Sequence, residues 1–598
     1  MNKTTAILFG MVLAVLIDGE ARAAAAESDY ALAFASLGPL NTDIFIADPD
    51  GSNPRPLLAH AEHDYNASYS HDGQWIVFTS LRNGSADIYR AHPDGSSLQR
   101  LTDDPAFDDQ AALSPDGKTL AFVSTRSGQA EIWVQNLPNG TPRNLTQHPA
   151  GDFRPAWSPD GQWLAFSSDR DSENLRRDFV TVHSTEIYVV RSDGAELRRV
   201  TQIKAFAGSP TWSSDGQRLL FYRAALDDVS RIASARRLRG VTQIMSIDLA
   251  TNALRELTAG EGEKWSPRSL AQDRVAYVSG GPGGGVEFTA GAAGARGEFR
   301  SPSWTTDGHH MVFHRDVEQA WPPFREQPSR DPQFRLVRTG IFPAYSPIAD
   351  RLVSNDRTAA ILHNVILVMN ANGSQPRTLF QDPTKGALAP AWSPRGDRVA
   401  FGLGRYFQTT LGPAAADIAV VNGDGAGLKI LTDGAGNYGF PSWSRDGRRI
   451  VYRHSKAGKS GLTIVDAATG AATPLNTGAD KENFPSWSPV DDRIAFTSYR
   501  EGNYDIYTIR PDGTGLQRLT HSPGNEAHCT WSPDGRWIAF ASAQQGFKDE
   551  AALHPFNPQP YGDIYVMRAD GSDVRQLVDD QFEDATPNWI PSGVLKKR

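Results

Sequence analysis

The stretch from residue 530 to residue 540 reads TWSPDGRWIAF, and it decides the fold. Its Ser-Pro-Asp-Gly core (532–535) is a tight-turn sequence, because Pro presets φ, Asp bonds its own backbone and Gly accepts a positive φ. The alternating residues after it (537–540) bury one face of a short strand. The stretch therefore predicts a turn that leads into a half-buried β-strand.

The same pattern returns along the chain at a fixed spacing. The residue before the turn recurs every 44 residues at Tyr69, Leu113 and Trp157, and again at Trp443, Trp487 and Trp531. After the second strand come an Asp-Ile-Tyr segment such as 505–507, another Asp-Gly turn and a closing Arg-Leu-Thr such as 518–520. Four short strands per unit are typical of a β-propeller blade, whereas a helical solenoid would show a 3.6-residue periodicity.

Eleven units carry the turn motif, and a twelfth is split between the two ends of the chain. The eleven are centred on Tyr69, Leu113, Trp157, Trp212, a degraded copy near Trp265, Trp304, Tyr345, Trp392, Trp443, Trp487 and Trp531. For the twelfth, segment 586–591 supplies a first strand, and segments 31–34, 43–46 and 55–58 supply strands two to four. Joining the two ends closes a ring without a bare strand edge.

These residues resemble the TolB-type propeller repeat, and the resemblance covers nearly all of residues 27–598. It implies an all-β fold of about twelve four-stranded, TolB-like blades in which the termini close a shared blade. Twelve blades exceed the usual four to eight, so we expect either two propellers or one large ring, and we favour two. The repeat is most degraded between residues 259 and 340, where the boundary of a second, middle propeller is expected.

Two departures from known propeller proteins limit what the resemblance implies. TolB has an α/β domain before its propeller, whereas strand signals here begin at Tyr30, so that domain is expected to be missing. The role of TolB in envelope integrity is therefore not carried over. Prolyl oligopeptidases carry a hydrolase domain beside their propeller, but the chain has no G-x-S-x-G nucleophile elbow, which excludes a serine peptidase.

The N-terminus predicts export. Lys3 precedes an apolar run over 6–17 and an A-x-A cleavage site, so residues 1–26 have the pattern of a signal peptide. We expect a periplasmic or secreted protein without membrane insertion. A single cysteine, Cys529, excludes an intramolecular disulfide. The formal net charge of −9 leaves no broad basic surface, which argues against nucleic-acid binding.

Insertions lengthen the loops that join strands two and three of several blades, on the face that also carries the blade-to-blade connections. They span 169–185, 223–241, 280–297, 315–338, 402–416 and 543–562. Arg, His and aromatic residues gather there, which predicts that a protein or an anionic glycan binds this loop-decorated face around the channel mouth. Ordinary solvated loop charges are the alternative. The candidate ligand-binding residues are Arg154, Arg223, Arg315, Trp321, Arg405, Tyr406 and Glu526.

Two functions stay open, and the first is preferred. One is a binding or scaffold protein for a protein or glycan partner. The other is a carbohydrate-active enzyme, in particular a polysaccharide lyase, in which Arg neutralises a uronate carboxylate and His or Tyr abstracts the adjacent proton. The candidate catalytic residues are His528, His554, His183 and Tyr561. No spacing predicts a metal site and no cofactor is expected, although a divalent metal stays open without support from any motif.

Overall fold

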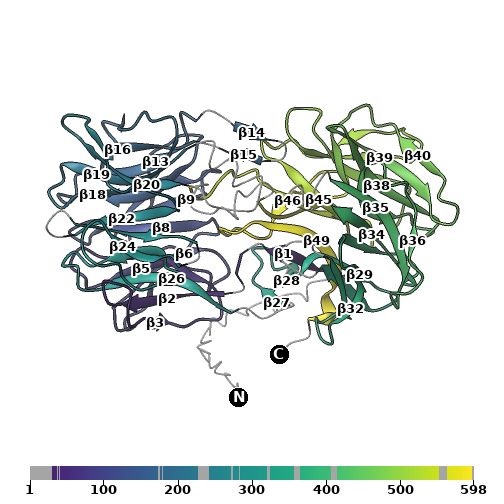
Figure 1. Ribbon diagram of the computed structural model, residues 1–598, viewed down its shortest axis with the longest axis horizontal. Coiled ribbons are helices and arrows are strands. Elements are labelled where there is room, and N and C mark those ends of the chain that lie inside the picture. The colour runs from purple at the N-terminus through teal and green to yellow at the C-terminus, as the bar shows by residue number, and fades with distance from the viewer. Residues whose placement is uncertain are drawn as a thin grey trace, which may run out of the picture.

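The computed structural model describes residues 30–595, apart from 37, 40, 173–174, 178–179, 183, 226–240, 271–273, 282, 319–323, 356–363, 406–413 and 551–561. The described residues form β-strands joined by turns, with one short 3-10 turn, η3 (Ser592–Val594). None of their helices is long and apolar enough to cross a membrane. The strands form two rings that lie side by side, one mostly purple to teal and the other mostly green to yellow (Figure 1).

The first ring contains six blades, whose innermost strands contact one another in sequence around the centre. From inside to outside the blades are: blade one, β25 (Arg300–Trp304), β26 (Met311–Glu318), β2 (Asn41–Ala47) and β3 (Arg55–Leu58); blade two, β4 (Asp64–Tyr69), β5 (Ile76–Ser80), β6 (Asp87–Ala91) and β7 (Gln99–Arg100); blade three, β8 (Asp108–Leu113), β9 (Thr119–Ser124), β10 (Glu131–Asn136) and β11 (Arg143–Asn144); blade four, β12 (Asp152–Trp157), β13 (Trp163–Ser168), β16 (Glu186–Arg191) and β17 (Arg198–Arg199); blade five, β18 (Phe206–Trp212), β19 (Arg218–Ala224), β20 (Thr242–Asp248) and β21 (Leu254–Glu256); and blade six, β22 (Lys264–Ser269), β23 (Val275–Ser279) and β24 (Gly285–Phe288). The loop of blade four adds a small hairpin, β14 (Leu175–Arg177) and β15 (Val180–Val182).

The second ring also contains six blades that close on themselves. They are: blade seven, β49 (Asp584–Pro591), β1 (Tyr30–Ser36), β28 (Phe334–Thr339) and β27 (Arg325–Gln327); blade eight, β29 (Ile341–Ser346), β30 (Arg351–Asn355), β31 (Val365–Asn370) and β32 (Arg377–Gln381); blade nine, β33 (Gly386–Trp392), β34 (Arg398–Arg405), β35 (Ala415–Asn422) and β36 (Lys429–Ile430); blade ten, β37 (Asn437–Trp443), β38 (Arg449–Lys456), β39 (Lys459–Asp466) and β40 (Ala472–Leu475); blade eleven, β41 (Glu482–Trp487), β42 (Ile494–Ser498), β43 (Asp505–Ile509) and β44 (Gln517–Arg518); and blade twelve, β45 (Glu526–Trp531), β46 (Trp537–Ser542), β47 (Asp563–Arg568) and β48 (Arg575–Gln576). A single bridge, Ala416 opposite Asn437, links blades nine and ten into one sheet.

Two blades are completed by segments that are distant in sequence. In blade seven the C-terminal β49 pairs antiparallel with β1, placing Trp589 opposite Leu32, and β1 pairs parallel with β28. In blade one β2 pairs antiparallel with β26, placing Phe45 opposite Phe313. The predicted all-β propeller fold is confirmed, including a blade shared by the two ends of the chain.

The predicted make-up of that shared blade is wrong in one respect. The sequence pattern places 43–46 and 55–58 beside 586–591, whereas the structure places them in blade one as β2 and β3. The degraded repeat around Trp304 supplies only β25 and β26 to its blade, so β2 covers the otherwise open edge of β26. The alternation of apolar residues specifies which face of a strand is buried but not which neighbouring strand it pairs with, so the sequence could not distinguish the two pairings.

A side-chain clasp holds the turn between the first two strands of most blades. In blade twelve the Ser532 hydroxyl donates to Asp534 Oδ1 at 2.6 Å and accepts from the amide of Trp537 at 2.9 Å. The same clasp is made by Ser70 with Asp72, Ser114 with Asp116, Ser158 with Asp160, and Ser444 with Asp446. Each turn thus satisfies its own polar groups, which explains why the Ser-Pro-Asp-Gly sequence marks the blades so regularly.

The aromatic residue before the turn joins neighbouring blades. The indole nitrogen of Trp157 donates to the carbonyl of Ala112 in the preceding blade at 3.1 Å, and Trp531 does the same to Ser486 at 3.1 Å. Between blades, fully buried rings such as Phe122 fill the layers of the core. The repeat therefore specifies both the blade and its packing against the next one.

The two rings meet through the faces that carry the blade-to-blade connections and the loops between strands two and three. Thr125, at the start of such a loop in blade three, donates to Asp579 Oδ2 in the second ring at 3.4 Å. Arg338, at the end of β28, contacts His63 Nε2 in the first ring at 2.7 Å. The described parts of the loop-decorated faces therefore lie against each other, and the opposite faces point away from the junction.

The substitution Ser532→Ala should lower the free energy of unfolding by about 1–3 kcal/mol, because it leaves the amide of Trp537 without its side-chain acceptor in a buried turn. Ser572→Ala is the matched control, since Ser572 makes a similar bond to Asp570 on an exposed turn and should change stability by less than about 0.5 kcal/mol. Urea unfolding followed by tryptophan fluorescence measures both. Equal effects of the two substitutions would contradict the clasp.

Candidate functional site

The wall of each central channel is set by one bulged residue per innermost strand, which adopts a positive φ. In the first ring these residues are Asn66, Gln110, Arg154, Ser209, Ser266 and Ser301, and in the second they are Phe342, Ala389, Phe440, Phe484, His528 and Thr586. Such bulges redirect a side chain away from the regular pleat. The two channels therefore have the same geometry but opposite chemistry, one polar and one largely apolar.

The polar channel is a continuous hydrogen-bond network across the blades of the first ring. Arg154 Nη1 donates to Ser301 Oγ at 3.0 Å, and Ser301 Oγ donates to Asn66 Oδ1 at 2.7 Å. Asn66 Nδ2 in turn donates to Asp109 Oδ2 at 2.8 Å. Burial raises the pKa of Asp109, while hydrogen bonds from Thr79 and Asn66 oppose that shift.

A segment of the second ring enters this channel. Arg154 Nε donates to Asp549 Oδ1 at 2.9 Å, and Arg154 Nη2 donates to Asp549 Oδ2, so the pair is bidentate. Gln110 Nε2 donates to the carbonyl of Lys548 at 2.9 Å. Residues 548–549 belong to the loop between strands two and three of blade twelve, so one propeller inserts a charged loop into the channel of the other.

The second channel is filled by its own aromatic side chains. The Phe484 and His528 rings lie 3.9 Å apart between centroids, and Phe440 lies 4.7 Å from Phe484. Phe342 packs against His528 with 5.6 Å between the ring centroids. Burial lowers the pKa of His528 to about 3, so this imidazole is neutral across the physiological range.

Buried charges concentrate where the two faces meet. Lys548 Nζ lies 2.7 Å from Asp563 Oδ2 and 2.6 Å from Asp579 Oδ1, and all three side chains are almost completely buried. Burial raises the pKa of Asp563 to about 7, against the opposing effect of Lys548. Arg338 Nη2 donates to Asp580 Oδ2 at 2.8 Å. These residues all belong to the second ring, and because breaking such a pair leaves an uncompensated buried charge, the pairs hold the Lys548 loop and the Asp580 segment on the face of that ring.

The structure does not bring the predicted catalytic and ligand-binding residues together. Arg154 and His528 lie in the channels of different propellers. Arg315 stacks 4.0 Å from the centre of the Phe45 ring, and Arg223 and Arg405 are exposed at the ends of β19 and β34. The remaining predicted residues, Trp321, Tyr406, His183, His554 and Tyr561, lie outside the described residues.

Glu526 is buried and serves its own blade. At the equivalent position in other blades an acidic residue pairs with an Arg two residues past the second strand: Asp64 with Arg82, Asp108 with Arg126, Asp152 with Arg170, and Glu482 with Arg500. Blade twelve has Gln544 at that place, and Glu526 accepts instead from Ser542 at 2.9 Å and Thr520 at 3.1 Å. Burial raises the pKa of Glu526 to about 8.

Sequence reasoning missed the inserted residues Lys548, Asp549 and Glu550, although it marked their loop as an insertion. A signal existed in the repeat itself. Gln544 and Gln576 stand where other blades carry the two Arg residues that pair with buried acids, so blade twelve lacks its usual cations. Lys548 supplies the missing charge to Asp563 from the loop.

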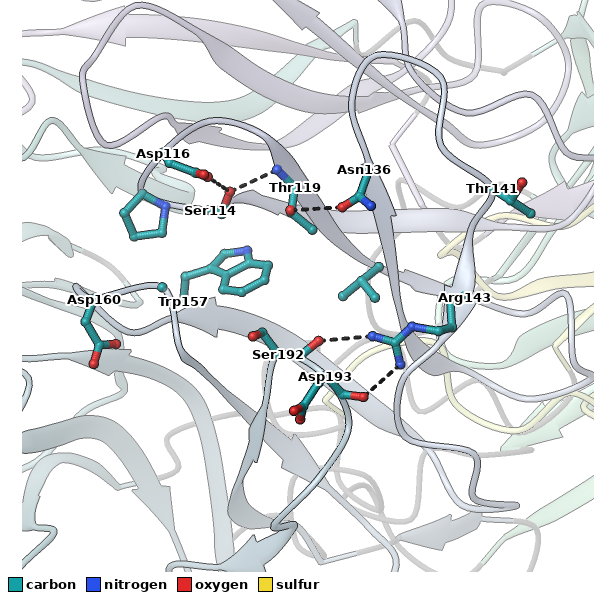
Figure 2. Close-up of a pocket in the computed structure, with 13 residues that line it drawn as sticks. Ser114, Asp116, Thr119, Asn136, Thr141, Arg143, Trp157, Asp160, Ser192 and Asp193 are labelled. Carbon is teal, nitrogen blue, oxygen red and sulfur yellow. Dashed lines mark hydrogen bonds between the residues drawn. The ribbon is translucent and has the colours of Figure 1, made fainter.

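A polar groove opens on the face that points away from the second ring. It has a volume of about 610 Å³ and lies between blades three and four. Figure 2 shows the indole of Trp157 between the turn at Ser114 and the turn at Ser192. Arg143 bridges the blades by donating to the carbonyls of Ser192 at 3.0 Å and Asp193 at 3.3 Å.

The rim of this groove is acidic. Asp116, Asp160 and Asp193 line it together with the amide of Asn136. Hydrogen bonds from Ser114 and Ser158 lower the pKa values of Asp116 and Asp160, so both are ionised at neutral pH. An indole surface ringed by carboxylates, an amide and hydroxyls suits sugar hydroxyl groups or a polar peptide, and an anionic ligand is disfavoured here. Within the described residues, no three metal-binding side chains cluster in a way that could hold a metal ion.

Comparisons with known proteins agree with the fold. A family model described as the tricorn protease N-terminal β-propeller domain matches residues 85–285, and one described as the TolB β-propeller domain matches residues 405–549. No curated protein matches the chain.

Solved structures of similar fold share little sequence with it. A putative TolB from Agrobacterium tumefaciens is 22% identical, with 47% of this chain and 100% of that chain covered and a TM-score of 0.35. The tricorn protease is 15% identical, with 80% and 46% covered and a TM-score of 0.32. An oligogalacturonate lyase from Vibrio parahaemolyticus is 12% identical, with 79% and 98% covered and a TM-score of 0.20. Likenesses this distant carry no argument about activity.

The pKa of Glu526 predicts a pH-dependent stability. The folded state holds a proton up to about pH 8 that the unfolded state releases near its ordinary value of 4.5, so stability falls as the pH rises between these values. Glu526→Gln should remove this dependence. As the pH rises, the free energy of unfolding of the variant should therefore increase relative to that of the wild type by on the order of 1 kcal/mol per pH unit. Urea unfolding at pH 5 and pH 8 measures it.

Gln544→Arg is the second variant for this test, because it restores the guanidinium that other blades place beside this acid. It should lower the pKa of Glu526 and flatten the same pH dependence without removing the carboxylate. A Glu526→Gln variant that shifts stability by the same amount at both pH values would contradict the protonated state of this side chain.

Proposed function

The chain is a TolB-like β-propeller protein, and from that premise we propose that it is an exported binding platform that holds a glycan or protein partner without reacting with it. The observation that carries the proposal is the division of its surfaces. The described parts of both channels are occupied by the protein's own side chains, whereas the groove at Trp157 is open. The signal-peptide pattern of residues 1–26 supports a periplasmic or secreted location.

The groove offers the contacts that a glycan needs. The indole of Trp157 provides an apolar face for a sugar ring, while Asp193 and Asn136 provide hydrogen-bonding groups in the same groove. Turns from two rigid blades hold these groups, so little order must be gained on binding. The acidic rim favours neutral sugar residues, or a basic peptide segment if the partner is a protein.

The lyase alternative gains no support from the described residues. A lyase would need a carboxylate-binding Arg beside a His or Tyr that accepts the proton. Arg154 is already paired with Asp549, and His528 lies within the aromatic cluster of the other propeller. His183, His554 and Tyr561 lie outside the described residues, so the lyase stays an outcome of the test rather than the proposal.

The test is binding of neutral and acidic oligosaccharides and a basic peptide, measured by calorimetry with the mature protein. Asp193→Asn keeps the turn, in which the amide of Ala195 donates to Asp193 Oδ1 at 2.9 Å, but removes a charge from the groove. It should weaken binding of the ligand about three- to tenfold. Asp94→Asn is the matched control, because Asp94 makes the same 2.9 Å turn bond outside the groove.

Three results would overturn the proposal. One is a ligand whose affinity is insensitive to Asp193→Asn, and another is the absence of any ligand in the panel. The third is new ultraviolet absorbance from an unsaturated uronate when an acidic polysaccharide is added, which would make the protein a lyase.

A further inference from the structure

We infer that the channel of the first propeller is a binding site for an acidic peptide segment, and that the protein occupies this site itself with Phe547–Glu550. We call these four residues the strap. The site is separate from the Trp157 groove and goes beyond the platform function, because it names a second ligand chemistry on the opposite face of the same propeller.

Arg154 makes one half of the site. Its guanidinium binds the Asp549 carboxylate in a bidentate manner, and its remaining group, Nη1, donates to Ser301 Oγ at 3.0 Å and Asn66 Oδ1 at 3.4 Å. Only 14% of the Arg154 side chain and 7% of the Asp549 side chain are exposed. Fork-shaped recognition of this kind is how proteins bind carboxylates with directional specificity.

Glu550 fills the other half, which is a cradle of donors from two blades. Ser167 Oγ and the amide of Ser209 each lie 2.5 Å from Glu550 Oε1, and Ser209 Oγ donates to Oε2 at 3.1 Å. Gly208 makes room for this carboxylate, because a Cβ there would lie 2.5 Å from Glu550 Oε2 and 2.4 Å from the Tyr222 hydroxyl. The cradle therefore fits a second carboxylate next to the first.

The site also recognises the main chain of the strap. Gln110 Nε2 donates to the carbonyl of Lys548, while Gln110 Oε1 accepts from the amide of Arg154 at 2.8 Å. Two adjacent carboxylates and a backbone carbonyl are features of a peptide with consecutive acidic residues. A polyuronate would present carboxylates on rings and would offer no amide carbonyl to Gln110.

The contrast with the second propeller indicates that the channel has a role beyond being filled. There the equivalent positions carry Phe342, Phe440 and Phe484, whose apolar contacts close the channel within the residues that the structure describes. Apolar side chains fill a buried space at least as favourably as ion pairs, which must be desolvated. The first channel instead keeps Arg154 and a cradle of donors, and the carboxylates of an acidic segment satisfy them.

Repulsion between buried carboxylates opposes the docking of the strap. Burial and the neighbouring Asp549 carboxylate raise the pKa of Glu550, and Asp109 adds a third buried acid near Arg154. One guanidinium thus faces three carboxylates. This excess of acid weakens the hold on any acidic segment in this channel, including the strap.

The test uses the full-length protein and a fluorescent hexapeptide with the sequence of Gln545–Glu550. The double substitution Asp549→Asn, Glu550→Gln removes the strap's charges, and this variant should bind the peptide at least tenfold more tightly than the wild type. The reason is that a tethered competitor acts at an effective concentration in the millimolar range. Adding Arg154→Met to the double variant should abolish binding. A peptide with Asn and Gln in place of its Asp and Glu is the control and should bind to neither protein.

A second measurement needs no variant. Saturating peptide should accelerate amide hydrogen exchange of Phe547–Glu550 in the wild type, which reports displacement directly. Acceleration by oligogalacturonate and not by the peptide would overturn the assignment of the ligand as a peptide.

The strap has a purely structural role if the peptide does not accelerate exchange and if a double variant with native circular dichroism gains no affinity for the peptide. Failure here is distinguishable from failure of the platform function, because the latter is read through Asp193→Asn on the opposite face.

Discussion

Hydrogen bonding between strands that are far apart in sequence is the constraint on which the whole molecule depends. An incomplete blade would leave strand edges exposed, so each ring completes one blade with strands from a distant part of the chain. The first ring takes β2 and β3 to complete blade one, and the second takes β1 to join β49 in blade seven. The chain therefore crosses between the rings twice, after β1 and after β26, and the rings cannot drift apart.

Where the loop-decorated faces of the two rings meet, the buried charged groups need partners. Arg154 of the first ring pairs with Asp549 of the second, while Lys548 pairs with Asp563 and Asp579 within the second ring and so fixes the loop that carries Asp549. Blade twelve departs from the repeat, because Gln544 and Gln576 stand where other blades carry the Arg residues that pair with their buried acids. The missing guanidinium leaves the burial-raised pKa of Glu526 without the opposing effect that Arg500 has on Glu482, and Lys548 replaces the other missing cation from the base of the strap.

The parts that the sequence predicts well are those determined by neighbours along the chain. The clasp between Ser532 and Asp534 and the alternation after it are local, so the blades can be identified one by one. The partner of β2 could not be predicted, because the edges of two incomplete blades are equivalent in hydrogen-bonding pattern. The partner of Arg154 could not be predicted either, since Asp549 is 395 residues away and belongs to another ring. His528 illustrates the same limit, because only its aromatic neighbours from other blades decide that it is neutral.

The interleaved path of the chain also sets the order in which the rings can be completed during synthesis. The first ring has all of its strands once β26 has emerged, so it can close while nearly half of the polypeptide is still to come. In the second ring, β1 lacks its antiparallel partner until β49, the last strand, is synthesised. Domains usually mature in order from the N-terminus. Here the strand that comes first belongs to the propeller that finishes last, and the completed first propeller keeps that strand close to its eventual partner.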